Sequence, residues 1–201
     1  MHLSAIVSIA LFATAATAVP VRNKVNPAYC DGVPKSGDPN VYLCGDYRLG
    51  PVKLPSAVPV SNLVDTYDRL GGLCPAQFLG NWTVNGSFKY PEATGGYVAD
   101  VSCKPIKGTV KLQVGTLLDR FGGEGGNFLS PKGAPYMERA LPPVNLNNNR
   151  TNVTDYPNGY HVYEVVKEFE VLAGPIAAWF GQPGGGTQYV FILILCWIFL
   201  K

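Results

Sequence analysis

The sequence predicts an α+β fold: a small, mostly antiparallel or mixed β-sheet with few short helices, preceded by an N-terminal arm pinned by disulfides. Three observations support this fold class. Apolar and polar residues alternate at 109–114, as in a half-buried strand. Residues 160–166 are rich in the aromatic and β-branched side chains that strands favour. Glycine (23 residues) and proline (17) indicate many turns, while 47% hydrophobic residues supply a core.

The N-terminus has the pattern of a secretory signal peptide, which we assign to residues 1–18. An apolar run at 5–12, too short to span a bilayer, is followed by a small-x-small cleavage pattern at Ala16 and Ala18. Asn-x-Ser/Thr sequons occur at Asn81, Asn85, Asn149 and Asn152. We therefore expect a secreted glycoprotein, either extracellular or at the cell surface, with its glycans on surface loops.

The N-terminal arm, residues 19–60, is rich in proline and glycine and has little periodicity, so we expect disulfides rather than a core to hold it. Four cysteines form an even set and predict two disulfides: Cys30, Cys44, Cys74 and Cys103. The pairing stays open, although a bond between Cys30 and Cys44 would close a small loop. A metal site is not expected, because the spacings are irregular and histidine is scarce.

The compact domain is expected at residues 61–189. Its first element is a short helix over 61–70, where Leu63, Tyr67 and Leu70 share one face and a glycine pair follows. The strand signals lie in 82–114, 160–166 and 169–172. A single domain of this kind fits the length that remains after the signal peptide.

Three function classes are disfavoured. The balance of 16 basic and 14 acidic side chains offers no broad cationic face, so nucleic acid is not an expected partner. A Rossmann dinucleotide site is not expected, because neither glycine run, at 121–127 or 181–187, follows a clear strand and opens a helix. A serine nucleophile lacks the GxSxG motif, and His161 would be its only histidine after signal-peptide removal.

Two glycine-rich runs, at 117–143 and 174–189, have a composition that core packing does not explain. The first contains two arginines, and the second ends in a turn that presents Gln188. Glycine lets the backbone approach a ligand closely, and arginine supplies planar donors for phosphate, while aromatic rings supply a stacking surface. These are the parts that a dinucleotide site needs.

Several motifs carry a family resemblance that covers most of residues 45–189. They are GDYRLGPVKLP at 45–55, YDRLGGLCP at 67–75, LDRFG at 118–122 with FLSPKGAPYMERALPP at 128–143, YHVYEV at 160–165 and GPIAAWFGQPGGGTQY at 174–189. In this order they resemble the tuberculosis necrotizing toxin family, most of all the secreted fungal surface NAD glycohydrolases that carry that domain. The resemblance implies cleavage of NAD+ into nicotinamide and ADP-ribose, with NADP+ as a further candidate substrate, no cofactor, and a homodimer.

The resemblance also implies roles for individual residues. Arg120 and Gln188 are the expected catalytic residues, and the expected substrate-binding residues are Phe121, Arg139, Tyr136 and His161. Structural roles compete with each of these. Arg120 could pair with Asp119 at the surface, Phe121 and Tyr136 could be core residues, Gln188 could satisfy a turn, and His161 could be structural.

The reaction itself favours electrostatics over acid catalysis. Nicotinamide leaves a cationic ring as a neutral molecule, so no general acid is needed for its departure from an oxocarbenium-like ribose. We expect Arg120 and Arg139 to hold the pyrophosphate, Phe121 to pack against nicotinamide or ribose, and Gln188 to contact the ribose or the attacking water. A carboxylate mechanism, through Glu124 or Glu138, stays open. So do a catalytically inactive secreted glycoprotein that keeps the fold as a binding module, and an ADP-ribosyltransferase-like toxin.

The C-terminal tail, residues 190–201, departs from the family pattern. It is apolar, contains Cys196, and is about half the ~20 residues that a membrane span requires. We expect either a truncated or misread terminus or a buried terminal strand. Family members can bind calcium in a more polar segment beyond this point, so no calcium site is assigned here.

Overall fold

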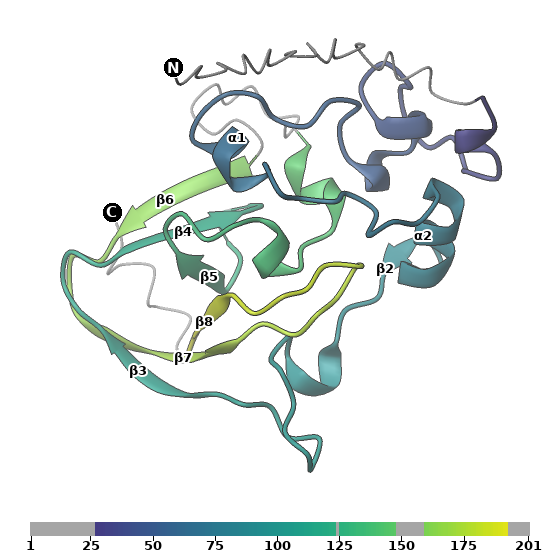
Figure 1. Ribbon diagram of the computed structural model, residues 1–201. Helices are drawn as coiled ribbons and strands as arrows, with labels where there is room; N and C mark the ends of the chain where they lie inside the picture. The colour runs from purple at the N-terminus through teal and green to yellow at the C-terminus, as the bar shows by residue number, and fades with distance from the viewer. Residues whose placement is uncertain (1–26, 124, 148–158, 193–201) are drawn as a thin grey trace, which may run out of the picture.

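A computed structural model describes residues 27–123, 125–147 and 159–192. Its centre is a six-stranded sheet of order β3-β7-β8-β5-β4-β6 in which all pairings are antiparallel (Figure 1). The strands are β3 Gly108–Leu112, β4 Leu117–Phe121, β5 Phe128–Pro131, β6 Tyr160–Glu164, β7 Phe169–Pro175 and β8 Thr187–Phe191. The predicted α+β class with a mostly antiparallel sheet is therefore confirmed.

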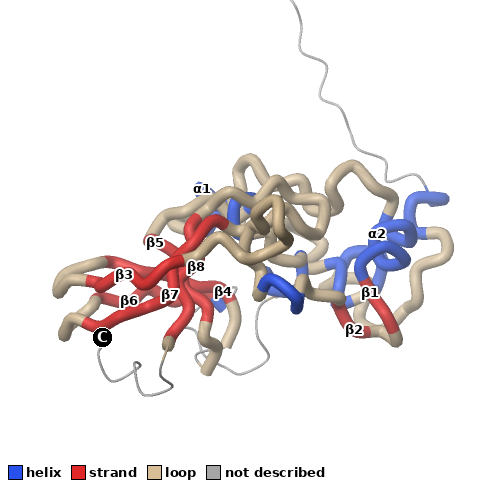
Figure 2. The backbone as a smooth tube through the Cα atoms, turned by 90° about the horizontal axis from the view of Figure 1, so that it is seen from below, coloured by secondary structure: helices blue, strands red, loops and turns tan. Residues whose placement is uncertain are grey.

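Short helices and a small hairpin accompany the sheet. They are α1 Val60–Leu63, α2 Pro75–Trp82, β1 Thr83–Val84 and β2 Ser87–Phe88, with the 3-10 helices η1 Pro27–Cys30, η2 Leu43–Gly45, η3 Tyr47–Leu49, η4 Glu92–Thr94, η5 Met137–Arg139 and η6 Pro143–Leu146. Figure 2 shows α2, β1 and β2 grouped at the end of the molecule opposite the six-stranded sheet. Strand signals were found in residues 82–114, but helix α2 was not predicted, although a proline at its first turn is a signal for it.

The predicted helix over residues 61–70 is mostly wrong. Helix α1 ends at Leu63, because Val64 leaves helical geometry with φ −105° and ψ 4°. The three residues that suggested a helical face, Leu63, Tyr67 and Leu70, are all buried. The spacing of these three residues indicated that they are buried on one side of the chain. A non-helical turn can bury residues at this spacing as well as a helix can.

Residues 117–143 were interpreted as a run that core packing does not explain, and this is also wrong in part. Strands β4 and β5 lie within it, and their side chains Leu118 and Leu129 are buried in the core on one face of the sheet. The opposite face carries Phe121, which packs with residues of α1 and the segment after it. The glycines between these strands and the proline that ends β5 hid the strand pattern.

The N-terminal arm is held by packing as well as by a disulfide, which corrects the expectation of disulfides alone. Cys30 and Cys44 form one disulfide. Leu49 is fully buried against Phe78 of α2 and other apolar side chains. Asp46 is also fully buried and pairs with Arg48, with 2.6 Å between the carboxylate and guanidinium.

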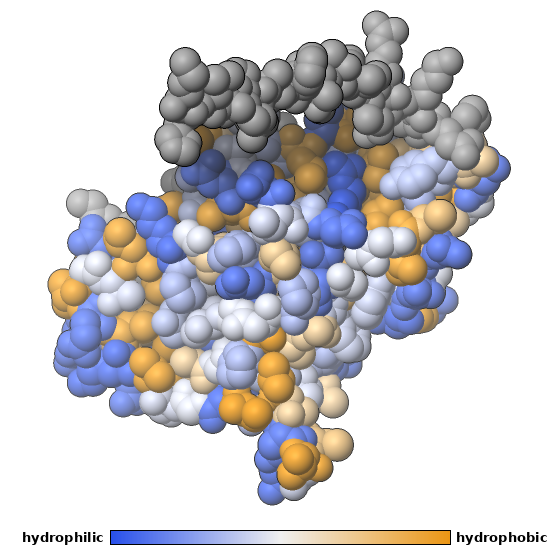
Figure 3. Space-filling view, in the orientation of Figure 1, coloured by the Kyte–Doolittle hydropathy of each residue, from blue (hydrophilic) through white to orange (hydrophobic). Residues whose placement is uncertain are grey.

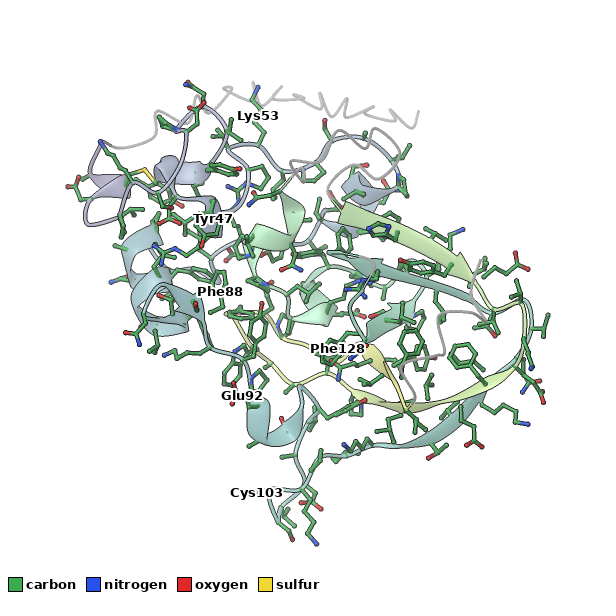
Figure 4. All side chains as sticks on the ribbon, turned by 180° about the vertical axis from the view of Figure 1, so that it is seen from behind. Tyr47, Lys53, Phe88, Glu92, Cys103 and Phe128 are labelled. Carbon is green, nitrogen blue, oxygen red and sulfur yellow. A yellow bond between two sulfur atoms is a disulfide. The ribbon has the colours of Figure 1, made fainter. Side chains whose placement is uncertain are left out.

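The expectation of a second disulfide is wrong, because Cys74 and Cys103 are both free and exposed. Cys74 caps the start of α2, whereas Cys103 lies in a turn closed by the Asp100 carboxylate, which accepts backbone N–H bonds from Ser102 and Lys104. This turn is the tip that projects below the sheet, apart from α2 (Figures 1 and 3), and Figure 4 labels Cys103 there. Separate placement therefore keeps the two thiols from pairing within one chain.

Other predictions concern the surface and the termini. Asn81 and Asn85 are exposed, as glycan acceptors must be, but Asn81 lies in α2 rather than in a loop. Strand β8 includes Val190 and Phe191, the first residues of the predicted tail. Residues 1–18, Glu124, Asn149, Asn152 and Cys196 lie outside the described residues. In the part of the chain that is described, no helix has the length and apolar character needed to cross a membrane.

Candidate functional site

A cavity of about 420 Å³ opens where β4 and β5 separate. The two strands pair only at Leu118 with Pro131 and at Asp119 with Ser130, so beyond these pairs their edges diverge. The lining residues are Tyr90, Pro91, Glu92, Gly95, Gly96, Asp119, Arg120, Phe121, Phe128, Leu129, Ser130, Arg139, Ala140, Leu141, Asn145, Ile176, Ala177, Trp179, Phe180 and Gln188. Figure 4 labels two of them, Phe128 at the start of β5 and Glu92 at the start of η4. The volume is within the usual range of small-molecule sites, about 300–1,000 Å³.

Arg120 reaches the cavity from β4 and is only 9% exposed. Its Nη1 donates a hydrogen bond to the carbonyl of Gly126, in the loop between β4 and β5. A Cβ at position 126 would lie 2.6 Å from Nη1, so only glycine lets the loop pass this close. The alternative of a surface arginine paired with Asp119 is not what the structure has.

Asp119 instead pairs with Arg139, and the Asp119 carboxylate is fully buried. Arg139 Nη1 lies 2.6 Å from Asp119 Oδ1, while Asp119 Oδ2 accepts hydrogen bonds from the Tyr160 hydroxyl and the Gly133 backbone, both at 2.8 Å. Burial, followed by the bond to Asp119, raises the pKa of Tyr160 well above its ordinary value. The phenol is therefore a neutral donor to this carboxylate at physiological pH.

Arg139 has donors committed to structure beyond this ion pair. Its Nε and Nη2 both donate to the carbonyl of Ala134, at 3.0 and 2.8 Å. Its guanidinium also lies 5.3 Å from the centre of the Phe121 ring. A guanidinium has five N–H donors, so two remain for a ligand.

The two predicted aromatic residues have different positions. Phe121 lines the cavity, with ring contacts to Tyr136 at 4.9 Å and Tyr160 at 5.0 Å between centroids. Tyr136 lies behind it, fully buried, with its hydroxyl donating to the carbonyl of Pro142 at 2.8 Å. Tyr136 does not line the cavity. Its ring packs behind Phe121 and supports that side chain.

Gln188 reaches the cavity from β8, and a hydrogen bond to the main chain orients its amide. Its Nε2 donates to the carbonyl of Gly95 at 2.9 Å, which fixes Oε1 as an acceptor. The main chain around Gly95 is itself secured to the end of β7, because Ala177 donates to the Gly96 carbonyl at 2.9 Å and Val98 to the Pro175 carbonyl at the same distance. The amide therefore has a defined direction.

His161 does not line the cavity. It lies on β6 in register with Arg120 of β4, and its ring stacks on Tyr163 with 6.2 Å between centroids. The structure therefore places His161 beside the strand that carries Arg120 and outside the cavity lining, and its predicted role in substrate binding stays a prediction. Among the six predicted site residues, the cavity brings together Arg120, Phe121, Arg139 and Gln188.

The two carboxylates predicted for a carboxylate mechanism are not among the described cavity residues. Glu138 is absent from the described lining, and Glu124 lies outside the described residues. Asp119 and Glu92 line it instead. Asp119 had a signal in the sequence, since it directly precedes Arg120, but its ion-pair partner is Arg139 and not Arg120, the partner considered as an alternative.

Glu92 had no such signal, because residues 90–96 have no pattern that relates them to the glycine-rich runs. The hydrogen bonds from Ala177 and Val98 bring them to the cavity, and only the folded chain reveals this. Among the described residues, no group of three or more His, Cys, Asp or Glu side chains could hold a metal ion.

Comparison with known proteins gives two sequence matches. Residues 111–194 match the family described as tuberculosis necrotizing toxin. The conidial surface nicotinamide adenine dinucleotide glycohydrolase nadA of Aspergillus fumigatus is 52% identical over 168 residues, which cover 82% of this chain and 69% of the relative.

Solved structures give weaker likenesses. Tse6 in complex with Tsi6 is 22% identical with a TM-score of 0.32, covering 43% of this chain and 65% of its own. Rhs1-CT in complex with its cognate immunity protein RhsI1 is 16% identical with a TM-score of 0.34, covering 49% and 77%. Tuberculosis necrotizing toxin complexed with its immunity factor IFT is 16% identical with a TM-score of 0.32, covering 72% and 82%.

Proposed function

The chain belongs to the tuberculosis necrotizing toxin family, and from this premise we propose that the cavity between β4 and β5 is where it hydrolyses NAD+. The protein is an NAD+ glycohydrolase: it breaks the bond between nicotinamide and ribose and yields nicotinamide and ADP-ribose. NAD+ is the substrate, and no cofactor takes part. The protein is secreted, extracellular or at the cell surface, in agreement with the conidial surface relative.

One observation supports the location of the site most strongly. Arg120, Arg139 and Gln188 come from different segments of the chain and all line the same cavity. The sequence alone had suggested these three residues for one dinucleotide. Their convergence joins cationic donors for phosphate to an amide acceptor within one small volume.

In the proposed mechanism, binding and orientation supply most of the rate enhancement. The C1′–N bond breaks with its electron pair passing to nicotinamide, which leaves as a neutral molecule. Water then attacks C1′ of the oxocarbenium-like ribose and releases its proton to solvent. The chain needs only to hold the ribose and a water molecule in line and to match the charge that develops.

Both arginines bind phosphate in this proposal. Arg139 is held by Asp119 and by the carbonyl of Ala134, and it keeps two N–H donors for a phosphate oxygen. Arg120 reaches the cavity from β4, where its Nη1 donates to the carbonyl of Gly126. We therefore assign the pyrophosphate contacts to Arg120 and Arg139 together.

Gln188 is proposed to act through Oε1. Because Nε2 is committed to Gly95, the amide oxygen is the group that can accept a hydrogen bond from a ribose hydroxyl or from the attacking water. Phe121 contributes a small apolar surface beside this position, close to the Arg139 guanidinium. Gln188 and Phe121 thus both help to position the substrate, and removal of either side chain would disrupt that position.

Product analysis tests the function. Purified protein is incubated with NAD+, and nicotinamide and free ADP-ribose are quantified over time. Equal amounts of the two products are expected. An ADP-ribose group attached to an acceptor would indicate transferase chemistry, and a protein without turnover would be an inactive binding module.

Three finer properties remain proposals. NADP+ is a further candidate substrate, supported by the two cavity arginines, and the ratio of its turnover to that of NAD+ measures it. A homodimer is a second, tested by the mass of the protein in solution. Calcium is not assigned to any described residue, and turnover measured with and without a chelator tests whether the protein needs it.

A further inference from the structure

One wall of the cavity is aromatic and has no role in the chemistry above. It consists of Tyr90, Pro91, Trp179 and Phe180, which we call the aromatic wall. Tyr90 is 52% exposed although its ring meets that of Phe180. A large exposed aromatic side chain at a cavity commonly marks a binding surface, because its ring can be covered by a ligand.

The aromatic wall is held by directional contacts. The Trp179 indole N–H donates to the carbonyl of Lys89 at 2.8 Å, which ties the ring to the residue before Tyr90. The Tyr90 and Phe180 rings meet edge to face, with centroids 5.4 Å apart and an interplanar angle of 85°. Trp82 of α2 supports Trp179 from 5.3 Å. A surface fixed in this way loses little conformational entropy when a flat ring stacks on it.

The aromatic wall and the arginines belong to different parts of the same cavity lining. Arg120 and Arg139 come from β4 and η5, whereas Tyr90 precedes η4 and Trp179 follows β7. A dinucleotide has two heterocycles joined through a pyrophosphate, so a cavity with phosphate donors and one broad stacking surface suits such a molecule.

The charge of each heterocycle decides the assignment. In NAD+ the nicotinamide ring is cationic and loses that charge as the C1′–N bond breaks. Aromatic faces with the Glu92 carboxylate in the same lining would stabilise the cationic substrate more than the transition state, and would slow the reaction. Adenine is neutral and does not react, so contacts with it hold the substrate equally well throughout.

We propose that the aromatic wall is the adenine subsite, with the purine ring stacked on Tyr90 and Trp179. The inference rests on the proposed function, since it takes NAD+ as the ligand. Arg120 and Arg139 then bind the pyrophosphate, and the reacting ribose lies beside Gln188. Adenine binding serves to position the substrate and leaves the chemical step unaffected.

Inhibition of NAD+ turnover by fragments of the substrate tests the subsite. The probes are AMP, ribose 5-phosphate and nicotinamide mononucleotide. For the unmodified protein, AMP should compete with NAD+ at least about tenfold more strongly than ribose 5-phosphate, because base stacking adds to the phosphate contact. Equal inhibition by these two fragments would overturn the proposal without any variant.

Variants at Tyr90 identify the surface. Tyr90→Ala should raise the KM for NAD+ and the inhibition constant of AMP by about 5- to 100-fold, the range of one stacked base, with kcat unchanged. Tyr90→Phe keeps the ring and should behave like the unmodified protein. Tyr47→Ala is the matched control, because Tyr47 is a partly exposed tyrosine of the arm outside the cavity lining (Figure 4).

The outcomes separate the subsite from the function. If Tyr90→Ala leaves AMP inhibition unchanged while NAD+ is still hydrolysed, adenine binds elsewhere and the inference is wrong. If Tyr90→Ala weakens nicotinamide mononucleotide instead of AMP, the aromatic wall binds the reacting half, which also overturns it. If the unmodified protein neither hydrolyses NAD+ nor binds these fragments, the proposed function itself fails.

Discussion

Arg139 and Asp119 form a buried ion pair with 2.6 Å between Nη1 and Oδ1, and this pair joins η5 to β4 at the edge of the cavity. The same carboxylate accepts a hydrogen bond from Tyr160 of β6, so one side chain links three segments of the chain. Asp119 lines the cavity next to Arg139 and holds the Arg139 guanidinium in place. The direction of the Arg139 guanidinium therefore depends on it.

Replacement of Asp119 by Asn should destabilise the fold and lower turnover. The change leaves the Arg139 charge buried without its counter-ion, and loss of one member of a buried pair costs about 3–5 kcal/mol. Denaturant unfolding measures the loss. Glu168→Gln is the control, because it removes the exposed partner of Lys111 and should change stability by less than about 1 kcal/mol. Equal stability losses in the two variants would contradict the role given to Asp119.

Replacement of Gly126 by Ala should impair turnover without unfolding the protein. The added Cβ would lie 2.6 Å from Arg120 Nη1, and the end of a flexible side chain moves more easily than the backbone. Loss of one charge-assisted contact predicts about a tenfold lower kcat/KM. Gly125→Ala is a matched control, since nothing lies within 4 Å of its Cβ position. Similar kinetics for both variants would show that the position of Arg120 has no effect on catalysis.

Stability in acid should depend on Asp46. Burial alone would raise the pKa of Asp46, but hydrogen bonds and charge from Arg48 hold it below its ordinary value of 3.8. The ionised carboxylate therefore stabilises the folded state above about pH 4, and this contribution is lost as the pH falls through the folded pKa.

Denaturant unfolding of Asp46→Asn and the unmodified protein from pH 3 to pH 7 measures this contribution. The difference in unfolding free energy should be largest near neutral pH and shrink below about pH 4. A difference in unfolding free energy that stays constant from pH 3 to pH 7 would refute the role given to Asp46.

Loss of the Cys30–Cys44 disulfide should lower stability but spare the cavity. The two cysteines are 14 residues apart in sequence, and closing a loop of that size is worth about 3 kcal/mol in the unfolded chain. The double variant Cys30→Ser, Cys44→Ser should unfold at lower temperature and keep its kcat. Cys74→Ser with Cys103→Ser serves as the control, because both thiols are free and exposed. An unchanged unfolding temperature in the first variant would contradict this account.

The sequence predicted the fold class well where patterns are local. Alternation at 109–114 marked β3, and the aromatic run after Tyr160 marked β6. It failed at β4 and β5, because both strands are short, a glycine-rich loop separates them, and their other partners, β6 and β8, are distant in the chain. It also took Tyr67 and Leu70 for helical residues, since burial in a turn can copy helical spacing.

The candidate site was predictable to a similar extent. Arg120, Arg139 and Gln188 stood out because arginine and glutamine in glycine-rich runs suggest ligand contacts. The buried ion pair between Asp119 and Arg139 could not be predicted from the sequence, because it depends on the relative position of β4 and η5. The aromatic wall was missed because the hydrogen bond between Trp179 and Lys89 joins segments that are 90 residues apart.

The initial rate of nicotinamide release from NAD+ tests the central claim most directly. It should be compared in the unmodified protein, Arg120→Ala and Gln188→Ala, with Arg69→Ala and Gln113→Ala as controls outside the cavity lining. We expect rates at least about a hundredfold lower for the two cavity variants, as for removal of one preorganised transition-state contact, and unchanged rates for both controls. Turnover by Arg120→Ala and Gln188→Ala equal to that of the unmodified protein would contradict the account.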